Sequence, residues 1–148
     1  MFLPQKTILV VDDDPVHLEL LYEIFSQRPN IRVETSKNAF DALGKIVVGE
    51  YDLVILDIVL PDMNGLQIIR YINKFEHLKN THFVLMSSHM EQYKNTILPM
   101  SVIAKFEKPF RFDSFIETIN KFIERKAKDD MIVRQYEIIE RTRQVAVY

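Results

Sequence analysis

Thr7-Ile-Leu-Val-Val-Asp-Asp-Asp-Pro15 is the stretch that decides the fold class. Its first five residues form an apolar run rich in β-branched side chains, which is typical of a strand buried on both faces of a parallel sheet. Asp14 and Pro15 then predict a helix start, because Asp is a favoured N-cap and Pro fits the first helical position. The stretch therefore predicts one β–α unit.

Four further β–α units follow this one. Short apolar runs predict strands, and residues at helical spacing between and after them predict helices. Such alternation implies an α/β domain with a doubly wound, parallel five-stranded sheet and helices on both faces. The further strands are expected at 31–35, 52–57, 81–87 and 102–106; the four later helices are expected around Phe40–Val47, Leu66–Phe75, Glu91–Leu98 and from a capping box at Ser114–Glu117 onward.

Composition narrows the class of protein. The chain has 148 residues, 47% of them hydrophobic, which suits one globular domain. It has no cysteine, which excludes disulfides and cysteine-ligated metal. Its 19 Lys and Arg nearly balance its 21 Asp and Glu, so we expect no binding to nucleic acid or to a membrane surface by bulk charge. No apolar run suits a membrane span and residues 1–5 do not fit a signal peptide, so a cytoplasmic location is predicted.

Several polar residues stand at the predicted carboxyl ends of the strands. In open α/β sheets this edge is where ligands bind. Carboxylates close together repel one another unless a cation lies between them, and hard oxygen ligands suit Mg²⁺. A neighbouring lysine and hydroxyl group can hold the oxygens of a phosphoryl group, with a carboxylate as nucleophile. The residues concerned are Asp12, Asp13, Asp57, Ser87 and Lys108.

Five motifs together resemble a response-regulator receiver domain over about residues 5–125. The resemblance implies a flavodoxin-like (βα)5 fold and a role in two-component or phosphorelay signalling. It also implies a sensor histidine kinase or a histidine phosphotransfer protein as partner. The motifs are Ile8-Leu-Val-Val-Asp-Asp-Asp-Pro15, Asp52-Leu-Val-Ile-Leu-Asp57 with Leu60-Pro61, Met63-Asn-Gly65, Val84-Leu-Met-Ser-Ser88 and Lys108-Pro109-Phe110.

The resemblance also implies a role for each acidic residue. Asp57 is expected to accept a phosphoryl group from a phosphohistidine. Asp13 is expected to ligate Mg²⁺ directly and Asp12 through water, and the backbone carbonyl of Val59 is expected to complete the protein ligands. A receiver promotes its own phosphorylation and dephosphorylation, so the chain is not expected to be an enzyme acting on a separate substrate.

The remaining polar positions include one departure from the family. Lys108 is expected to pair with the phosphoryl oxygens, and Ser87 to hydrogen-bond them and so report the phosphorylated state. The position that usually holds an aromatic switch residue has Lys105 instead, with Phe106 beside it. For His17, on the first helix, we expect a solvated side chain.

Two alternative functions compete with the receiver interpretation. Asp12-Asp13-Asp14 also matches a haloacid-dehalogenase-like phosphatase motif, in which Asp12 is the nucleophile and Asp14 the acid/base. That scheme needs a later acidic pair, for which only Asp129-Asp130 is available, and it leaves Asp57 unexplained. The other alternative is a receiver-like scaffold that acts without phosphorylation through its C-terminal extension.

Residues 126–148 form this extension, which is too short for a core of its own. Two apolar series repeat at intervals of seven: Met131, Ile138 and Val145, and Ile132, Ile139 and Ala146. They indicate either a helix end that frays or a helix that docks on a partner or a second copy, giving a homodimer. Alternatively, the sequence of residues 145–148 is typical of a strand that adds to a sheet.

Overall fold

One parallel sheet forms the centre of the molecule. The structure is a computed structural model that describes residues 3–146. Its five strands lie in the order β2-β1-β3-β4-β5, and every neighbouring pair is parallel. This confirms the predicted doubly wound, flavodoxin-like sheet. The strands are β1 (Lys6–Val11), β2 (Ile31–Ser36), β3 (Leu53–Asp57), β4 (His82–Ser87) and β5 (Val102–Glu107).

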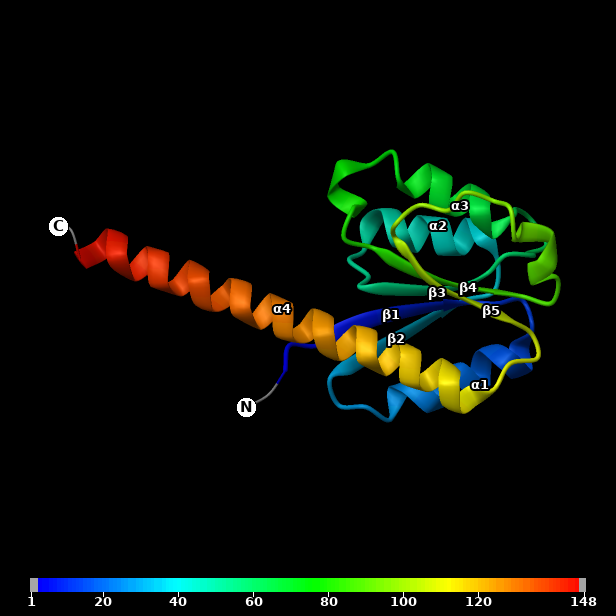
Figure 1. Cartoon of the computed structure of the whole chain (residues 1–148), viewed down its shortest axis with the longest axis horizontal. Helices are drawn as coiled ribbons and strands as arrows, with labels where there is room; N and C mark the ends of the chain where they lie inside the picture. The colour runs from blue at the N-terminus through cyan, green and yellow to red at the C-terminus, as the bar shows by residue number, and fades with distance from the viewer. Residues whose placement is uncertain (1–2, 147–148) are drawn as a thin grey trace.

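Helices cover both faces of the sheet (Figure 1). One face carries α1 and α4, and the other carries α2, α3 and a 3₁₀ turn, η1. A second 3₁₀ turn, η2, follows β4. The bounds are α1 (Pro15–Ser26), α2 (Ala39–Val48), α3 (Gly65–Ile72), η1 (Glu76–Leu78), η2 (Met90–Tyr93) and α4 (Phe112–Ala146).

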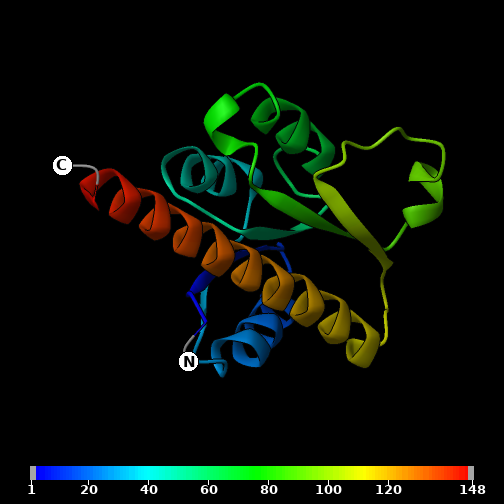
Figure 2. The same cartoon turned by 60° about the vertical axis from the view of Figure 1, so that its left-hand side comes forward.

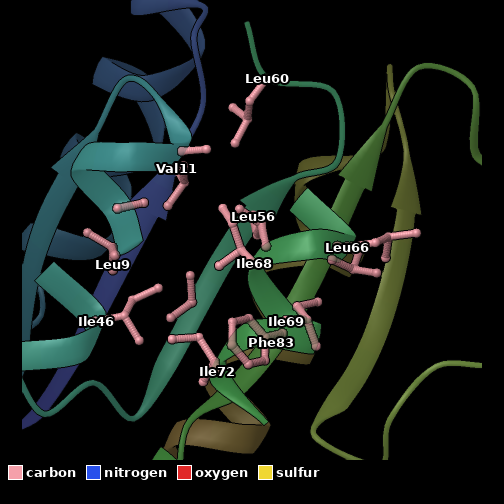
Figure 3. Close-up of a cluster of buried hydrophobic side chains, with 14 of the residues drawn as sticks. Leu9, Val11, Ile46, Leu56, Leu60, Leu66, Ile68, Ile69, Ile72 and Phe83 are labelled. Atoms are coloured by element: carbon pink, nitrogen blue, oxygen red, sulfur yellow. The ribbon is translucent and has the colours of Figure 1, made fainter. Parts of the chain in front are cut away.

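Two hydrophobic cores lie on either side of the sheet because successive strand residues point to opposite faces. In β1, Leu9 and Val11 belong to the core under α2 and α3, whereas Ile8 and Val10 belong to the core under α1 and α4. Figure 3 shows the first of these cores, in which Phe83 of β4 lies among the aliphatic side chains. All five of these residues have no exposed surface, which explains the unbroken apolar runs.

Helix starts follow the local sequence. Asp14 caps α1, where it accepts hydrogen bonds from the backbone of Val16 and His17. Asn38 caps α2 by accepting from Asp41 N, and Asn64 forms a capping box with Gln67 at the start of α3. These side chains satisfy backbone donors that a helix leaves without partners, so each fixes where its helix begins.

The predicted helix at 91–98 is wrong. The structure has only the 3₁₀ turn η2, and the segment after Tyr93 is irregular up to β5. The residue before η2, His89, makes no capping hydrogen bond with its side chain. Ile97 and Met100 are almost fully exposed, so this segment has little apolar burial to stabilise a helix. Pro99 also prevents extension toward β5.

Two smaller expectations also fail, and one confirmed helix residue, Phe40, is unexpectedly exposed. The capping box at Ser114 does not form, because α4 already begins at Phe112 and the Ser114 hydroxyl donates to the carbonyl of Arg111. Phe75 lies after the end of α3 rather than on it. Phe40 is on α2 but 63% exposed, because the small residues of that helix, Ala39 and Ala42, face the sheet.

The last helix continues through the extension without interruption. From Phe112 to Ala146 it has 35 residues, and its second half projects beyond the sheet in both views (Figures 1 and 2). Val145 and Ala146 are helical rather than extended, and residues 147–148 lie outside the described part of the chain. Among residues 3–146, no helix is both long and apolar enough to cross a membrane.

Candidate functional site

The carboxyl edge of the sheet gathers the polar residues singled out in the sequence. Asp12 follows β1, Asp57 is the last residue of β3, Ser87 is the last of β4, and Lys108 follows β5. Asp12 and Ser87 have no exposed surface, and Asp57 is 6% exposed. Buried polar groups need partners, so the contacts among them define the site.

Lys108 joins the two buried carboxylates. Its ammonium Nζ donates to Asp12 Oδ2 at 2.8 Å and to Asp57 Oδ2 at 2.7 Å. The other oxygens accept from the backbone: Asp12 Oδ1 from Asp14 N at 2.9 Å, and Asp57 Oδ1 from Val59 N at 3.1 Å. Each carboxylate is therefore held in one orientation by a charged donor and a backbone donor.

The pKa values of the two buried carboxyl groups, Asp12 and Asp57, shift in opposite directions. Burial raises the pKa of Asp12, but hydrogen bonds from His17 and Lys108 outweigh it and lower the pKa to about 2. Burial also raises the pKa of Asp57, and here Lys108 offsets only part of the effect while the charge of Asp12 adds to it. Burial lowers the pKa of Lys108, yet the two carboxylates outweigh it and raise the pKa above its usual value. The carboxylate of Asp57 is thus more basic than that of Asp12.

A third carboxylate completes a group that can hold a cation. Asp13 is exposed, and carboxylate oxygens of Asp12, Asp13 and Asp57 lie within 4.8 Å of one another. With Lys108, three carboxylates and one ammonium group leave two formal negative charges. Because all the ligand atoms are hard oxygens, the chemistry of this set fits Mg²⁺.

The turn after Asp57 is held by backbone hydrogen bonds. Ile58 N donates to the carbonyl of Met86 on β4, and Gly65 N donates to the carbonyl of Ile58 at 2.7 Å. Val59 forms an antiparallel bridge with Asn64, and its side chain is exposed. These bonds place the Val59 peptide beside the Asp57 carboxylate, while its carbonyl as a metal ligand stays a prediction.

The usual switch position holds an exposed lysine, Lys105. The Ser87 hydroxyl accepts from His89 N at 3.0 Å, so it is tied to the loop after β4. Lys105 is exposed, and Phe106 packs against Phe110 and Phe115 in the core under α1 and α4. The aromatic side chain beside the usual switch position therefore belongs to this core.

The expectation of a solvated His17 is wrong. Its Nδ1 contacts Asp12 Oδ2 directly, and its ring lies edge-on to Phe110 at 5.7 Å between centroids. Only 16% of the side chain is exposed. His17 stands five residues after Asp12 on the first turn of α1, and the cap at Asp14 folds that turn back over β1. The five-residue spacing between Asp12 and His17 is the feature of the sequence from which this contact could have been predicted.

Asp62 is a second residue that the sequence analysis missed. From the loop after β3, its carboxylate oxygens accept from Ala39 N at 2.8 Å and Phe40 N at 2.9 Å at the start of α2. Burial raises the pKa of Asp62, but these two hydrogen bonds, together with those from the backbone of Asp62 and Met63, outweigh it and lower the pKa below its usual value. The loop that carries Val59 is thereby tied to α2 across more than twenty residues of sequence, a contact for which no local pattern exists.

The phosphatase scheme finds no support in the geometry. Asp14 is a helix cap that accepts from Val16 N at 3.0 Å. Asp130 lies at the other edge of the sheet, where it pairs with Lys6 at the start of β1. The later acidic pair is therefore remote from Asp12, whereas Asp57 is joined to Asp12 through Lys108.

Comparisons with known proteins agree with this arrangement. Residues 8–120 match the model of the response regulator receiver domain. The response regulator SSK1 of Verticillium dahliae is 39% identical over 77 residues, 52% of this chain and 9% of that protein. The response regulator ArlR of Staphylococcus aureus is 29% identical over 126 residues, 84% of this chain and 56% of that protein. The chain thus spans only part of the length of these relatives.

A solved structure supports the same assignment. The response regulator protein TrrA of Thermotoga maritima, in complex with Mg²⁺ and BeF, is 34% identical with a TM-score of 0.69. The alignment covers 80% of this chain and 99% of that one. The non-phosphorylated HemR receiver domain of Leptospira biflexa is 30% identical with a TM-score of 0.69, covering 80% and 94%. The chain belongs to the response-regulator receiver family.

Proposed function

We propose that Asp57 is the phosphoacceptor of this receiver and takes its phosphoryl group from a phosphohistidine. The observation that carries the proposal is the position of Asp57, which accepts from Lys108 and has a carboxylate oxygen within 4.8 Å of those of Asp12 and Asp13. In the transfer, an Asp57 oxygen forms the new P–O bond and the P–N bond of the donor breaks, leaving the imidazole with the bonding electron pair. The raised pKa of Asp57 favours a nucleophilic carboxylate.

The neighbours of Asp57 supply position and charge. We assign Mg²⁺ to Asp13 and Asp57 directly, to Asp12 through water and to the Val59 carbonyl; when bound, the ion neutralises charge that develops on the phosphoryl oxygens. Lys108 would exchange its bond to Asp57 Oδ2 for one to the transferred group. Ser87 would turn from His89 N to the phosphoryl oxygens and so make the loop after β4 sensitive to phosphorylation.

The proposal also covers the domain boundaries and the partners of the chain. We assign the receiver to residues 5–125 and a helical extension to 126–148. Its donor would be a sensor histidine kinase or a histidine phosphotransfer protein, and the extension would hold two copies together. The catalytic work concerns the chain's own phosphorylation and dephosphorylation. The cytoplasmic location and the absence of nucleic-acid and membrane binding stay predictions from composition.

Acetyl phosphate tests the phosphoacceptor. The chain is incubated with Mg²⁺ and acetyl phosphate, its intact mass is measured, and the acyl phosphate is trapped with borohydride. One added phosphoryl group, mapped to Asp57 and lost in Asp57→Asn, is expected, with Asp14→Asn as a matched control that keeps it. Trapping at Asp12 would support the phosphatase scheme. No adduct, even with a phosphorylated donor protein, would favour the scaffold.

A further inference from the structure

The extension carries an exposed apolar stripe on α4, beyond the part of this helix that packs on the sheet. Ile132, Tyr136 and Ile139 are 48%, 66% and 46% exposed. They lie at intervals of four and three residues, so they share one face of α4. The stripe follows Lys126 and Asp130, through which α4 contacts Asn80 and Lys6. A face of this kind on a rigid helix requires a cover.

A groove of about 980 Å³ runs beside the first half of α4, at the edge of the sheet opposite Asp57. Its lining includes Phe122 and Arg125 of α4 together with Val48 and Met100. Val48 and Met100 are 87% and 98% exposed, so apolar surface is open there too. The groove is therefore wide, partly apolar and separate from the site already described.

The groove and the stripe lie on one continuous face of the same helix. Arg125, Ile132 and Ile139 follow each other at intervals of seven, which is close to two helical turns. Phe122 and Tyr136 are two such intervals apart. If two copies of α4 lie side by side in opposite directions, the stripe of each copy faces the groove of the other.

Charge fixes the register of such a pair. Lys121 and Glu117 form an ion pair on the groove side of α4, and Glu140 and Arg143 form one beside the stripe. When two α4 helices run in opposite directions, Glu117 and Lys121 of one copy follow the same line as Arg143 and Glu140 of the other. Each charge then lies opposite one of the other sign. A register that places Phe122 opposite Ile139 also places Lys121 opposite Glu140. In a two-fold interface every such contact occurs twice.

We propose that two copies of this chain pair through antiparallel α4 helices, with the stripe of each copy docked in the groove of the other. The inference deepens the proposed dimer and rests on it, but it does not depend on phosphorylation of Asp57. Beyond the bare expectation of a dimer, it names the docking surface, the direction of the helices and the ion pairs that select them.

Crosslinking distinguishes this arrangement from a parallel coiled coil. The chain has no cysteine, so single substitutions introduce unique thiols. Thr118→Cys and Arg143→Cys lie at the rim of the proposed interface and face each other across it. In an antiparallel pair each position is about 38 Å of helix away from its own copy, since 25 residues separate the two. An equimolar mixture treated with a short bis-maleimide should give a crosslinked dimer, whereas neither variant alone should give one.

Charge exchange supplies a second measurement. Lys121→Glu and Glu140→Lys each replace two attractive pairs with repulsion, so the dimer dissociation constant in sedimentation should rise about tenfold. The double variant restores the pairs with opposite sign and should return the constant to within about twofold of the wild type. Acetyl phosphate labelling of all variants should stay unchanged, which separates this test from the phosphoacceptor proposal.

Three results would overturn the inference. A monomer in sedimentation at about 100 μM would remove both the dimer and its docking mode. A dimer in which Arg143→Cys crosslinks alone would indicate a parallel coiled coil. A dimer that gives no crosslink in the mixture and no rescue in the double variant would place the interface elsewhere on the molecule.

Discussion

A methyl group on Gly65 would collide with the backbone that carries Asp57. Gly65 is the first residue of α3, and a Cβ atom there would lie 2.6 Å from the carbonyl oxygen of Asp57 and 3.1 Å from the Cα atom of Ile58. Backbone atoms cannot rotate away as the end of a flexible side chain can. Gly65→Ala therefore has to displace either the start of α3 or the turn after β3.

The expected loss of stability follows from this contact. Overpacking in a dense interior costs about 1–3 kcal/mol, and the alanine recovers about 0.4–1 kcal/mol by restricting the unfolded chain. The net prediction for Gly65→Ala is a loss of about 1–2 kcal/mol in the free energy of unfolding. Gly44 is the matched control, since a Cβ atom in that position of α2 meets nothing within 4 Å. Gly44→Ala should gain about 0.5–1 kcal/mol from helix propensity.

Urea unfolding followed by circular dichroism measures both free energies, and acetyl phosphate labelling measures the site. Gly65→Ala should label more slowly than the wild type per folded molecule, because the displaced turn carries the Asp57 carboxylate. Gly44→Ala should label at the wild-type rate. A Gly65→Ala protein as stable as Gly44→Ala, with unchanged labelling, would refute the claim that the close approach at Gly65 positions Asp57.

Three further predictions concern Lys108, Val59 and His82. Lys108→Met should slow labelling of Asp57 by about 100-fold, measured by intact mass, because one positioned cation is removed from the reacting oxygens. Val59→Asn should shorten the life of the acyl phosphate, followed by its mass after removal of the donor, since an apolar side chain at Val59 cannot orient an attacking water. Burial and Lys126 lower the pKa of His82 below 6.5, so the unfolded chain takes up that proton first as the pH falls. The stability that this provides is complete well above pH 6.5 and is lost as the pH falls below it; in urea titrations His82→Asn should lose less stability than the wild type as the pH is lowered through that range.

The sheet could be predicted because its information is local. Each buried strand is an unbroken apolar run. Asp12 directly follows β1 and Asp57 is the last residue of β3, so these two aspartates mark the ends of their strands. Parallel strands bring their carboxyl ends to one edge, so the meeting of these aspartates with Lys108 follows from topology alone. The contacts at 2.7 and 2.8 Å are the consequence of that rule.

The failures concern features that local pattern does not determine. The segment after η2 has helical spacing, but Leu98 packs against the core while Ile97 is 95% exposed, so little apolar burial is available to stabilise a helix. Asp62 reaches α2 from a different loop. Lys6 pairs with Asp130 across 124 residues, and nothing near either residue in the sequence announces that contact. His17 alone was within reach of a geometric argument, from its place on the first turn of α1.

The long helix α4 connects the carboxyl edge of the sheet, where Lys108 lies, to the extension. It starts four residues after Lys108 and has 35 residues, about 52 Å in length. Lys126 donates to the carbonyl of Asn80 at 2.6 Å, and Asp130 pairs with Lys6, so α4 is held to the sheet edge near its middle. The first half of α4 is packed on the sheet through Phe115, Ile119 and Ile123, and about 24 Å of helix continues from Asp130 to Ala146, so a displacement of the first half would carry this end with it. A flexible linker would absorb such a movement, whereas a continuous helix transmits it to the surface on which a second copy would dock.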